Sequence, residues 1–289
     1  MSEKNLINLN PQRVKNRRVK VFGLMAVSTF LATLKWMTVI PTDSWWLTKF
    51  LMVALFILTF AWIALFFWSS VFGFIELLKG SKVPGIRWVP EETRLSSKVA
   101  VLMPVYNESL LAMGNDLVKT GQGKAFDFFV LSDTTNPKVW VEEEKTWLEA
   151  KKLMPEEINL YYRRRAQNTA RKSGNIEDFC NKWGSEYDFM VVLDADSLVN
   201  GSTMVKMAQL MEANEHTGII QAPPMCVNKH SLFARMQQFA GKVYGPIVAA
   251  GLAYWQVGDS NYWGHNAIIR VKAFMQCCGL PVLKGRAPF

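Results

Sequence analysis

Histidine and cysteine are scarce in this sequence of 289 residues, which has three histidines and four cysteines. The cysteines form no Cys-x-x-Cys pair, and the adjacent Cys277 and Cys278 have poor geometry for a disulfide. Reduced thiols are therefore expected, and a metal ion would need mainly oxygen ligands, which argues against a catalytic zinc. The patterns GxxxxGK[ST] and GxGxxG are also absent, so a kinase, an NTPase or a dinucleotide-dependent dehydrogenase is unsupported.

Acidic residues are fewer than basic residues, 24 against 33, which gives a formal net charge of +9. Many basic residues gather in two clusters: Arg13, Lys15, Arg17, Arg18 and Lys20, and Arg163, Arg164, Arg165, Arg171 and Lys172. Positive charge can indicate nucleic-acid binding, but no helix-turn-helix, zinc-finger or RNA-binding pattern accompanies it. The first cluster directly precedes an apolar segment, so the lipid bilayer is the expected partner and nucleic acid is not.

Two long apolar runs follow the first basic cluster, at residues 21–40 and about 47–78. Each is long enough to cross a bilayer as a helix. A cleaved signal peptide is the alternative for the first run, but the run is too long and lacks a small-residue cleavage site. Lysine and arginine flank the pair and are absent from the turn at 41–46, which places both ends in the cytoplasm of a multi-pass inner-membrane protein. The expected domains are a basic cytoplasmic N-terminus (1–20), a membrane hairpin (21–78), a linker (79–97) and a cytoplasmic domain (98–289).

The last of these segments alternates apolar strands with helical stretches. Strands are predicted at 99–105, 128–131, 160–162, 190–193 and 218–221. Helices are predicted from Asn136 and Pro137, from Ser173 or Asn175, and after Ser202. This alternation is typical of an α/β fold with a mostly parallel sheet, which binds ligands at the carboxyl ends of its strands. A further apolar stretch at 243–255 is too short to span a membrane and is expected to be a buried or interfacial helix.

Acidic residues follow two of these strands. Asp194 and Asp196 are two residues apart, so on an extended backbone they face the same side. With no lysine competing for them, they form a candidate site for Mg²⁺ or Mn²⁺, which would offset the charge of a diphosphate. Asp133 could accept hydrogen bonds from a nucleobase or a ribose. The alternative for each aspartate is that it caps the turn or helix that follows.

Basic residues near these strands could neutralise a diphosphate, with a solvated basic face as the alternative. The candidates are Arg164, Arg165, Arg171 and Lys172.

Four motifs, in this order and spacing, resemble those of family 2 glycosyltransferases. Residues 101–108 (VLMPVYNE) resemble the opening strand, and residues 171–176 (RKSGNI) resemble the KAGN element. Residues 194–196 (DAD) resemble the DxD motif, and residues 264–267 (GHNA) resemble the acceptor-side GTNA element. The stretches 132–137, 162–165 and 237–270 resemble, more narrowly, the branch that makes osmoregulated periplasmic glucans in Gram-negative bacteria.

The resemblance implies a GT-A-like nucleotide-sugar-binding domain that transfers glucose from UDP-glucose to a growing β-glucan with inversion. Carried over by residue, Asp133 would hold the uridine, Lys172 would lie near the nucleotide, and Asp194 and Asp196 would hold the metal and the diphosphate. Further substrate-binding candidates come from the opening-strand motif and from the acceptor-side element: Tyr106, Glu108, Trp263, Gly264, His265 and Asn266. Partner proteins in glucan export stay unknown.

The family's catalytic base is an aspartate downstream of the GTNA-like element, where it removes the proton of the acceptor hydroxyl. After Asn266 the sequence contains no aspartate or glutamate, and Asp259, which precedes the element, is a poor substitute. We therefore expect a C-terminally truncated chain whose base lies beyond Phe289, with weak UDP-glucose binding and slow turnover. Two alternatives stay open: a cellulose-, chitin- or hyaluronan-type synthase that uses another UDP-sugar, and a non-catalytic membrane protein that binds nucleotide sugars.

Overall fold

The computed structural model describes residues 11–40, 45–80, 86–90, 92–106, 119–195, 197–227, 230–259 and 261–278. Contacts divide the chain into two compact units. The helical unit comprises Met1–Ile86 and Pro223–Asn261, and the α/β unit comprises Arg87–Ala222 and Tyr262–Phe289.

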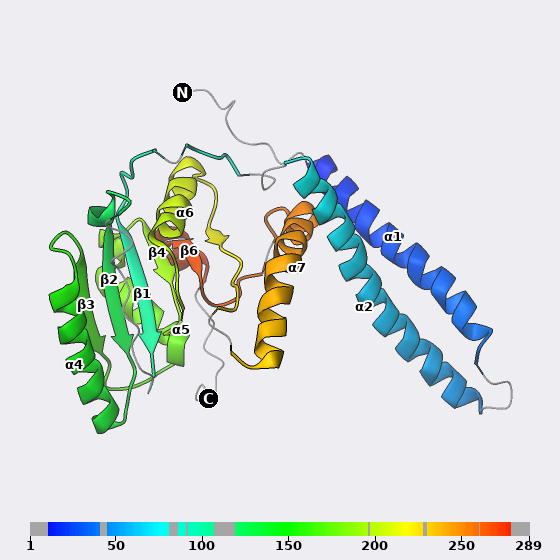
Figure 1. Cartoon of the computed structure of the whole chain (residues 1–289), viewed down its shortest axis with the longest axis horizontal. Helices are drawn as coiled ribbons and strands as arrows, with labels where there is room; N and C mark the ends of the chain where they lie inside the picture. Colours follow the sequence, from blue (N-terminus) through cyan, green and yellow to red (C-terminus); the bar gives the residue numbers. More distant parts are fainter. Residues whose placement is uncertain are drawn as a thin grey trace. The chain divides into compact units, whose positions relative to one another are not determined.

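Two long helices open the helical unit, α1 (Pro11–Met37) and α2 (Trp46–Leu78), drawn in blue and cyan in Figure 1. Both are long and apolar enough to cross a membrane, and only 11% and 6% of their most apolar windows are buried, unlike the core helix of a soluble protein. The predicted hairpin is thus confirmed as a pair of candidate membrane helices. Helix α1 begins ten residues before the apolar run, because the basic segment before Val21 consists largely of good helix formers.

The third helix of this unit is α7 (Leu232–Gln256), which is longer than the predicted apolar helix at 243–255. It crosses α2 where Gly73 and Gly251 meet. A Cβ atom added to Gly251 would lie 2.2 Å from the Ser69 carbonyl oxygen, so only glycine allows this approach. The rings of Phe72 and Tyr254 stack beside the crossing with centroids 4.9 Å apart. The sequence-based division placed 98–289 in one domain, whereas this close packing puts residues 223–261 with α1 and α2.

The described part of the α/β unit contains a six-stranded sheet in the order β3-β2-β1-β4-β6-β5. Its strands are β1 (Val99–Val105), β2 (Phe126–Ser132), β3 (Asn159–Arg164), β4 (Phe189–Val192), β5 (Ile219–Gln221) and β6 (Ala267–Arg270). Strands β3, β2, β1 and β4 are parallel, and β6 is antiparallel to both of its neighbours. The arrowheads of β1 and β2 reach the same edge of the sheet in Figure 1, as parallel pairing requires.

Helices cover both faces of this sheet. They are α4 (Pro137–Leu153), α5 (Arg171–Trp183), α6 (Gly201–Ala213) and α8 (Val271–Cys277), with short 3₁₀ turns at Gly123–Ala125 and Gly184–Glu186. Alternate residues of β1 enter two separate cores: Val101 packs with α4 and α6, and Leu102 packs with α5 and α8. This period of two is what a strand buried on both faces requires. The α/β class predicted from the sequence is confirmed.

Strand β6 was missed by the sequence analysis. It has only four residues and runs directly into α8, so a short apolar run there does not distinguish a strand from a helix. The other five strands lie where predicted. Because β6 is antiparallel to β4, with Ala267 paired to Val192, the amino end of β6 meets the carboxyl ends of the parallel strands. The segment that precedes β6 therefore lies at the carboxyl edge of the parallel strands, where sheets of this class commonly bind ligands.

Candidate functional site

The carboxyl edge of the sheet gathers most of the described candidate residues. Asp133 follows β2, Asp194 follows β4, and Tyr106 follows β1 between them with 49% of its surface exposed. Residues 262–266 lie at the same edge because they precede the antiparallel β6. Glu108 and Asp196 lie outside the described residues. The strand order thus brings together groups that are up to 160 residues apart, from Tyr106 to Asn266.

Lys172, in the first turn of α5, connects three parts of this edge. Its ammonium group donates to the carboxylate of Asp194 and to the carbonyl oxygen of Gly264, the latter at 2.9 Å. Both charged side chains are about 40% exposed, so the pair is accessible to a ligand. The prediction that no lysine competes for the DxD carboxylates is therefore wrong, because α5 brings Lys172 to Asp194 across 22 residues of sequence.

The carboxylate of Asp194 does not cap the next helix. Its backbone carbonyl accepts from Ser197 N at 3.0 Å in a tight turn, whereas α6 begins only at Gly201, after Asn200. Among the described residues, no three histidine, cysteine, aspartate or glutamate side chains form a metal-binding group. One half-exposed carboxylate at a strand end is a suitable oxygen ligand for Mg²⁺ or Mn²⁺ but supplies only part of a site. The metal remains a proposal.

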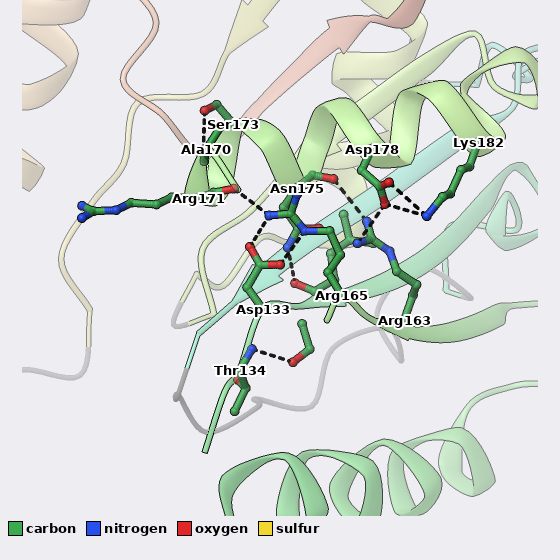
Figure 2. Close-up of polar contacts among 12 residues, drawn as sticks. Asp133, Thr134, Arg163, Arg165, Ala170, Arg171, Ser173, Asn175, Asp178 and Lys182 are labelled. Atoms are coloured by element: carbon green, nitrogen blue, oxygen red, sulfur yellow. Dashed lines mark hydrogen bonds and ion pairs between the residues drawn. The ribbon is translucent and has the colours of Figure 1, made fainter. Parts of the chain in front are cut away.

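Asp133 is held by Arg165 in a two-pronged ion pair. Both carboxylate oxygens accept from the guanidinium, each at 2.7 Å, and the side chains are only 4% and 11% exposed. Arg165 also donates to the carbonyl of Arg171 at 3.1 Å, which ties the pair to the start of α5 (Figure 2). Asp133 does not cap α4, because Asn136 does so by accepting from Lys138 N, and both carboxylate oxygens of Asp133 accept from Arg165. Such a buried pair is costly to break from either side.

The residues of the second basic cluster make different contacts. Arg163 makes an ion pair with Asp178 at 3.1 Å, and the guanidinium of Arg164 stacks 3.9 Å above the ring of Trp140. Figure 2 shows the side chain of Arg171 extending away from the Asp133–Arg165 pair, and this residue is exposed. Of the basic residues predicted to neutralise a diphosphate, Lys172 alone contacts the candidate DxD aspartate in the described structure.

The segment before β6 is fixed by hydrogen bonds to the end of β5. Gln221 Oε1 accepts from Trp263 N, and Ala222 N donates to Asn266 O, both at 3.0 Å. Around this segment, three buried side-chain atoms have no hydrogen-bond partner among the described residues: Gln221 Nε2, His265 Nδ1 and Asn266 Oδ1. Unpaired buried polar groups are costly, and sugar hydroxyls are suitable partners for them. The sequence analysis missed Gln221, although a polar residue at the end of an apolar strand was an available signal.

Tyr262 is a second residue that the sequence analysis missed. Partial burial and the nearby negative charge of Asp194 raise the pKa of Tyr262 to about 12. Its hydroxyl is therefore protonated, and able to donate a hydrogen bond, throughout the physiological pH range. The exposed ring of Trp263, which the resemblance had placed near the acceptor, is its neighbour in sequence.

Comparison with known proteins shows the family to which this chain belongs. The family model for glycosyl transferase family 2 matches residues 100–278, and the chain belongs to that family. It is 44% identical over 284 residues to a protein of Shewanella sp. (strain ANA-3) named glucans biosynthesis glucosyltransferase H. A protein of the same name from Shewanella oneidensis is 47% identical over 248 residues, and one from Shewanella baltica (strain OS155) is 46% identical over 248. These matches cover 96%, 83% and 83% of the chain but only 38%, 34% and 34% of the relatives.

Proposed function

We propose that this chain forms the nucleotide-sugar-binding part of an inner-membrane glucosyltransferase that extends a β-glucan from UDP-glucose with inversion. The supporting observation is the contact of Lys172 with both Asp194 and Gly264, because it joins the DxD-like, KAGN-like and GTNA-like elements at one accessible edge. The names of the relatives support glucose as the transferred sugar and a glucan as the product.

The donor would lie across this edge. Lys172 is placed to exchange its contact with Asp194 for the diphosphate, and Asp133, oriented by Arg165, would accept hydrogen bonds from the uridine. A Mg²⁺ or Mn²⁺ ion held by Asp194 and Asp196 would supply positive charge to the leaving diphosphate. The opening-strand residues Tyr106 and Glu108 are proposed as further donor contacts.

The acceptor would lie against residues 262–266, where Trp263 offers an exposed ring and His265 and Asn266 have unpaired polar atoms. In the transfer, an acceptor hydroxyl oxygen bonds to the anomeric carbon while the bond from that carbon to the β-phosphate oxygen breaks. The electron pair leaves with UDP, and the hydroxyl proton passes to a carboxylate base. We assign that base to no described residue. Asp259 is a poor candidate for it, because it precedes the acceptor-side element and its carboxylate accepts from Arg18 at 2.6 Å.

The membrane position follows from α1 and α2. Exposed apolar side chains such as Phe30 and Leu58 cover helices long enough to span a bilayer, and the basic residues of the first cluster occupy the amino-terminal turns of α1, before its apolar run. By the positive-inside rule, both ends of the hairpin would lie in the cytoplasm, where the donor nucleotide is found.

Isothermal titration calorimetry of the detergent-solubilised chain with UDP-glucose tests the donor site. Because Asp194 would contribute metal-dependent binding, Asp194→Asn should weaken UDP-glucose binding in Mn²⁺ by about tenfold or more, which corresponds to about 1.4 kcal/mol. Lys172→Met should weaken binding with and without metal. Glu177→Gln is the matched control, since it removes an exposed carboxylate from α5 and should leave binding unchanged.

A panel of UDP-sugars tests the choice of sugar. Tighter binding of UDP-N-acetylglucosamine than of UDP-glucose would contradict a glucosyltransferase and favour the chitin- or hyaluronan-type alternative. Equal binding by wild type and Asp194→Asn would contradict the donor site itself.

A further inference from the structure

A carboxylate is buried beneath the turn that carries Asp133. Glu143, on the inner face of α4, is only 3% exposed, although its neighbours Glu142 and Glu144 are exposed. None of the motifs described above includes Glu143. Burying a carboxylate is strongly unfavourable unless its oxygens receive hydrogen bonds, so its partners should explain its position.

Glu143 accepts hydrogen bonds from three hydroxyl groups. Ser132 Oγ donates to Oε2 at 2.7 Å, Tyr162 OH donates to the same oxygen at 3.1 Å, and Thr134 Oγ1 donates to Oε1. The three donors come from the end of β2, the turn after it, and β3. Burial, together with the neighbouring negative charge of Glu143, raises the pKa of Tyr162 to about 12, so the phenol remains a donor at neutral pH.

Two of these donors flank Asp133 in the chain. Ser132 Oγ also accepts from Thr134 N at 3.2 Å, so the backbone on both sides of Asp133 is tied to one carboxylate (Figure 2 shows the Thr134 contact). Arg165 fixes the Asp133 side chain from the other direction. The turn is thereby held at both the backbone and the side chain.

We infer that Glu143 is a positioning residue for the donor nucleotide: through Ser132 and Thr134 it holds the turn that presents Asp133 to the uridine. The inference rests on the proposed function, because it assigns the uridine contact to Asp133. A purely structural role would weaken every ligand of the site alike. A positioning role acts on the Asp133 end of the ligand and leaves the Asp194 end unaffected.

The test compares two ligands that divide the site, UDP and inorganic pyrophosphate, each titrated in Mg²⁺ by calorimetry. Glu143→Gln replaces one acceptor oxygen with an NH2 group that itself donates. At least one of the three hydroxyl groups then loses its acceptor, while the side-chain volume hardly changes. We expect it to weaken UDP binding by about tenfold and pyrophosphate binding by less than about twofold, a difference of about 1 kcal/mol. Glu142→Gln, the exposed neighbour, is the control and should change neither.

A milder variant keeps the test decisive if Glu143→Gln folds poorly. Tyr162→Phe retains the carboxylate and removes one donor, and it should weaken UDP binding by about threefold with pyrophosphate binding unchanged. Equal loss for both ligands, or no loss for UDP, in the folded variants would overturn the inference. Asp194→Asn, measured alongside, separates the two failures. If it weakens pyrophosphate binding while Glu143→Gln spares UDP, only the positioning role is wrong, and if it has no effect, the proposed function fails and the inference fails with it.

Discussion

The two units of this molecule differ in how most of their buried hydroxyl and carboxylate groups are satisfied, although Trp68 Nε1 of α2 also donates to Ser28 Oγ of α1. In α1, the hydroxyls of Ser28, Thr29 and Thr33 donate to carbonyls of their own helix one turn earlier, at 2.7–2.8 Å. In the α/β unit, buried polar groups pair across elements, as in the Asp133–Arg165 ion pair and the hydroxyls around Glu143. Large apolar side chains are exposed along α1 and α2, whereas those of the central strands are buried.

This difference indicates the solvent for which each unit is built. A helix in lipid must satisfy its polar groups internally, because hydrocarbon offers no hydrogen bonds. A water-facing enzyme domain can keep charged groups at the ends of buried strands, where one side contacts protein and the other can contact a ligand. Four substitutions or conditions, given from the largest expected effect to the smallest, test this comparison.

Breaking the buried ion pair should have the largest effect. Asp133→Asn leaves the guanidinium of Arg165 buried with a weakened partner, and removing one member of a buried pair typically costs about 3–5 kcal/mol. We expect the α/β unit to lose about 3 kcal/mol of unfolding free energy, measured by denaturant unfolding followed through amide hydrogen exchange. The double variant Asp133→Leu/Arg165→Met should recover part of it. A loss below about 1 kcal/mol would show that the pair is solvated.

The glycine crossing in the helical unit comes next. Gly251→Ala places a Cβ atom 2.2 Å from the carbonyl oxygen of Ser69, so α7 must shift away from α2. Overpacking of this kind costs about 1–3 kcal/mol and should expose residues 223–261 to limited proteolysis. Gly245→Ala is the control, because a Cβ atom there meets nothing within 4 Å, and alanine is the better helix former. If both variants are cleaved at the same rate, the close approach of Gly251 to α2 does not stabilise the packing of α7.

Alkaline pH should weaken the α/β unit. The folded state raises the pKa of Tyr162 to about 12 from its ordinary value of 10, so it binds the proton more tightly than the unfolded state does. The resulting stability is fully present below pH 10 and is lost as pH rises from about 10 to about 12. The melting temperature, measured by thermal unfolding at pH values across this range, should fall more steeply with pH for wild type than for Tyr162→Phe. Parallel curves would exclude Tyr162 as a source of the pH dependence.

The exposed ion pair of the helical unit should contribute least. Asp259 is 80% exposed where it meets Arg18, so Asp259→Asn should change stability by less than about 0.5 kcal/mol. Arg18→Gln should cost about 1 kcal/mol, because Arg18 also donates to the carbonyls of Trp255 and Gln256 at the negative end of the α7 dipole. The free energy of unfolding of both variants, measured at low and at high salt, checks these values, because salt screens an exposed ion pair. An Asp259→Asn effect as large as that of Asp133→Asn would remove the contrast between the units.

Much of the secondary structure could be predicted from local pattern. The apolar runs gave α1, α2 and five strands, and Asn136 with Pro137 correctly marked the start of α4. Strand β6 could not be recognised, because its four residues carry too little periodicity and their partner, β4, lies about 75 residues earlier. Helix α7 was recognised only in part, and its packing against α2 depends on two glycines that lie 178 positions apart.

The candidate site was predicted as a set of residues but not as a set of contacts. Asp133, Lys172 and Asp194 were named from strand ends and motifs, and the structure places all three at one edge of the sheet. Their partners were not foreseen, since nothing in the local sequence pairs Asp133 with Arg165, or Glu143 with Ser132 and Tyr162. Roles in binding for these residues stay predictions until ligands are measured.

The sequence by itself determined the lengths of the apolar helices, the alternation of strands and helices, and the placement of acidic residues directly after buried strands. These are properties of neighbouring residues, set by backbone geometry and the transfer of apolar side chains from water. Only the tertiary structure decided that Lys172 holds Asp194, that an antiparallel strand brings residues 262–266 to the same edge, and that α7 packs with α1 and α2. Such pairings depend on strand order and close packing, which join residues too distant in the chain for any local pattern to specify.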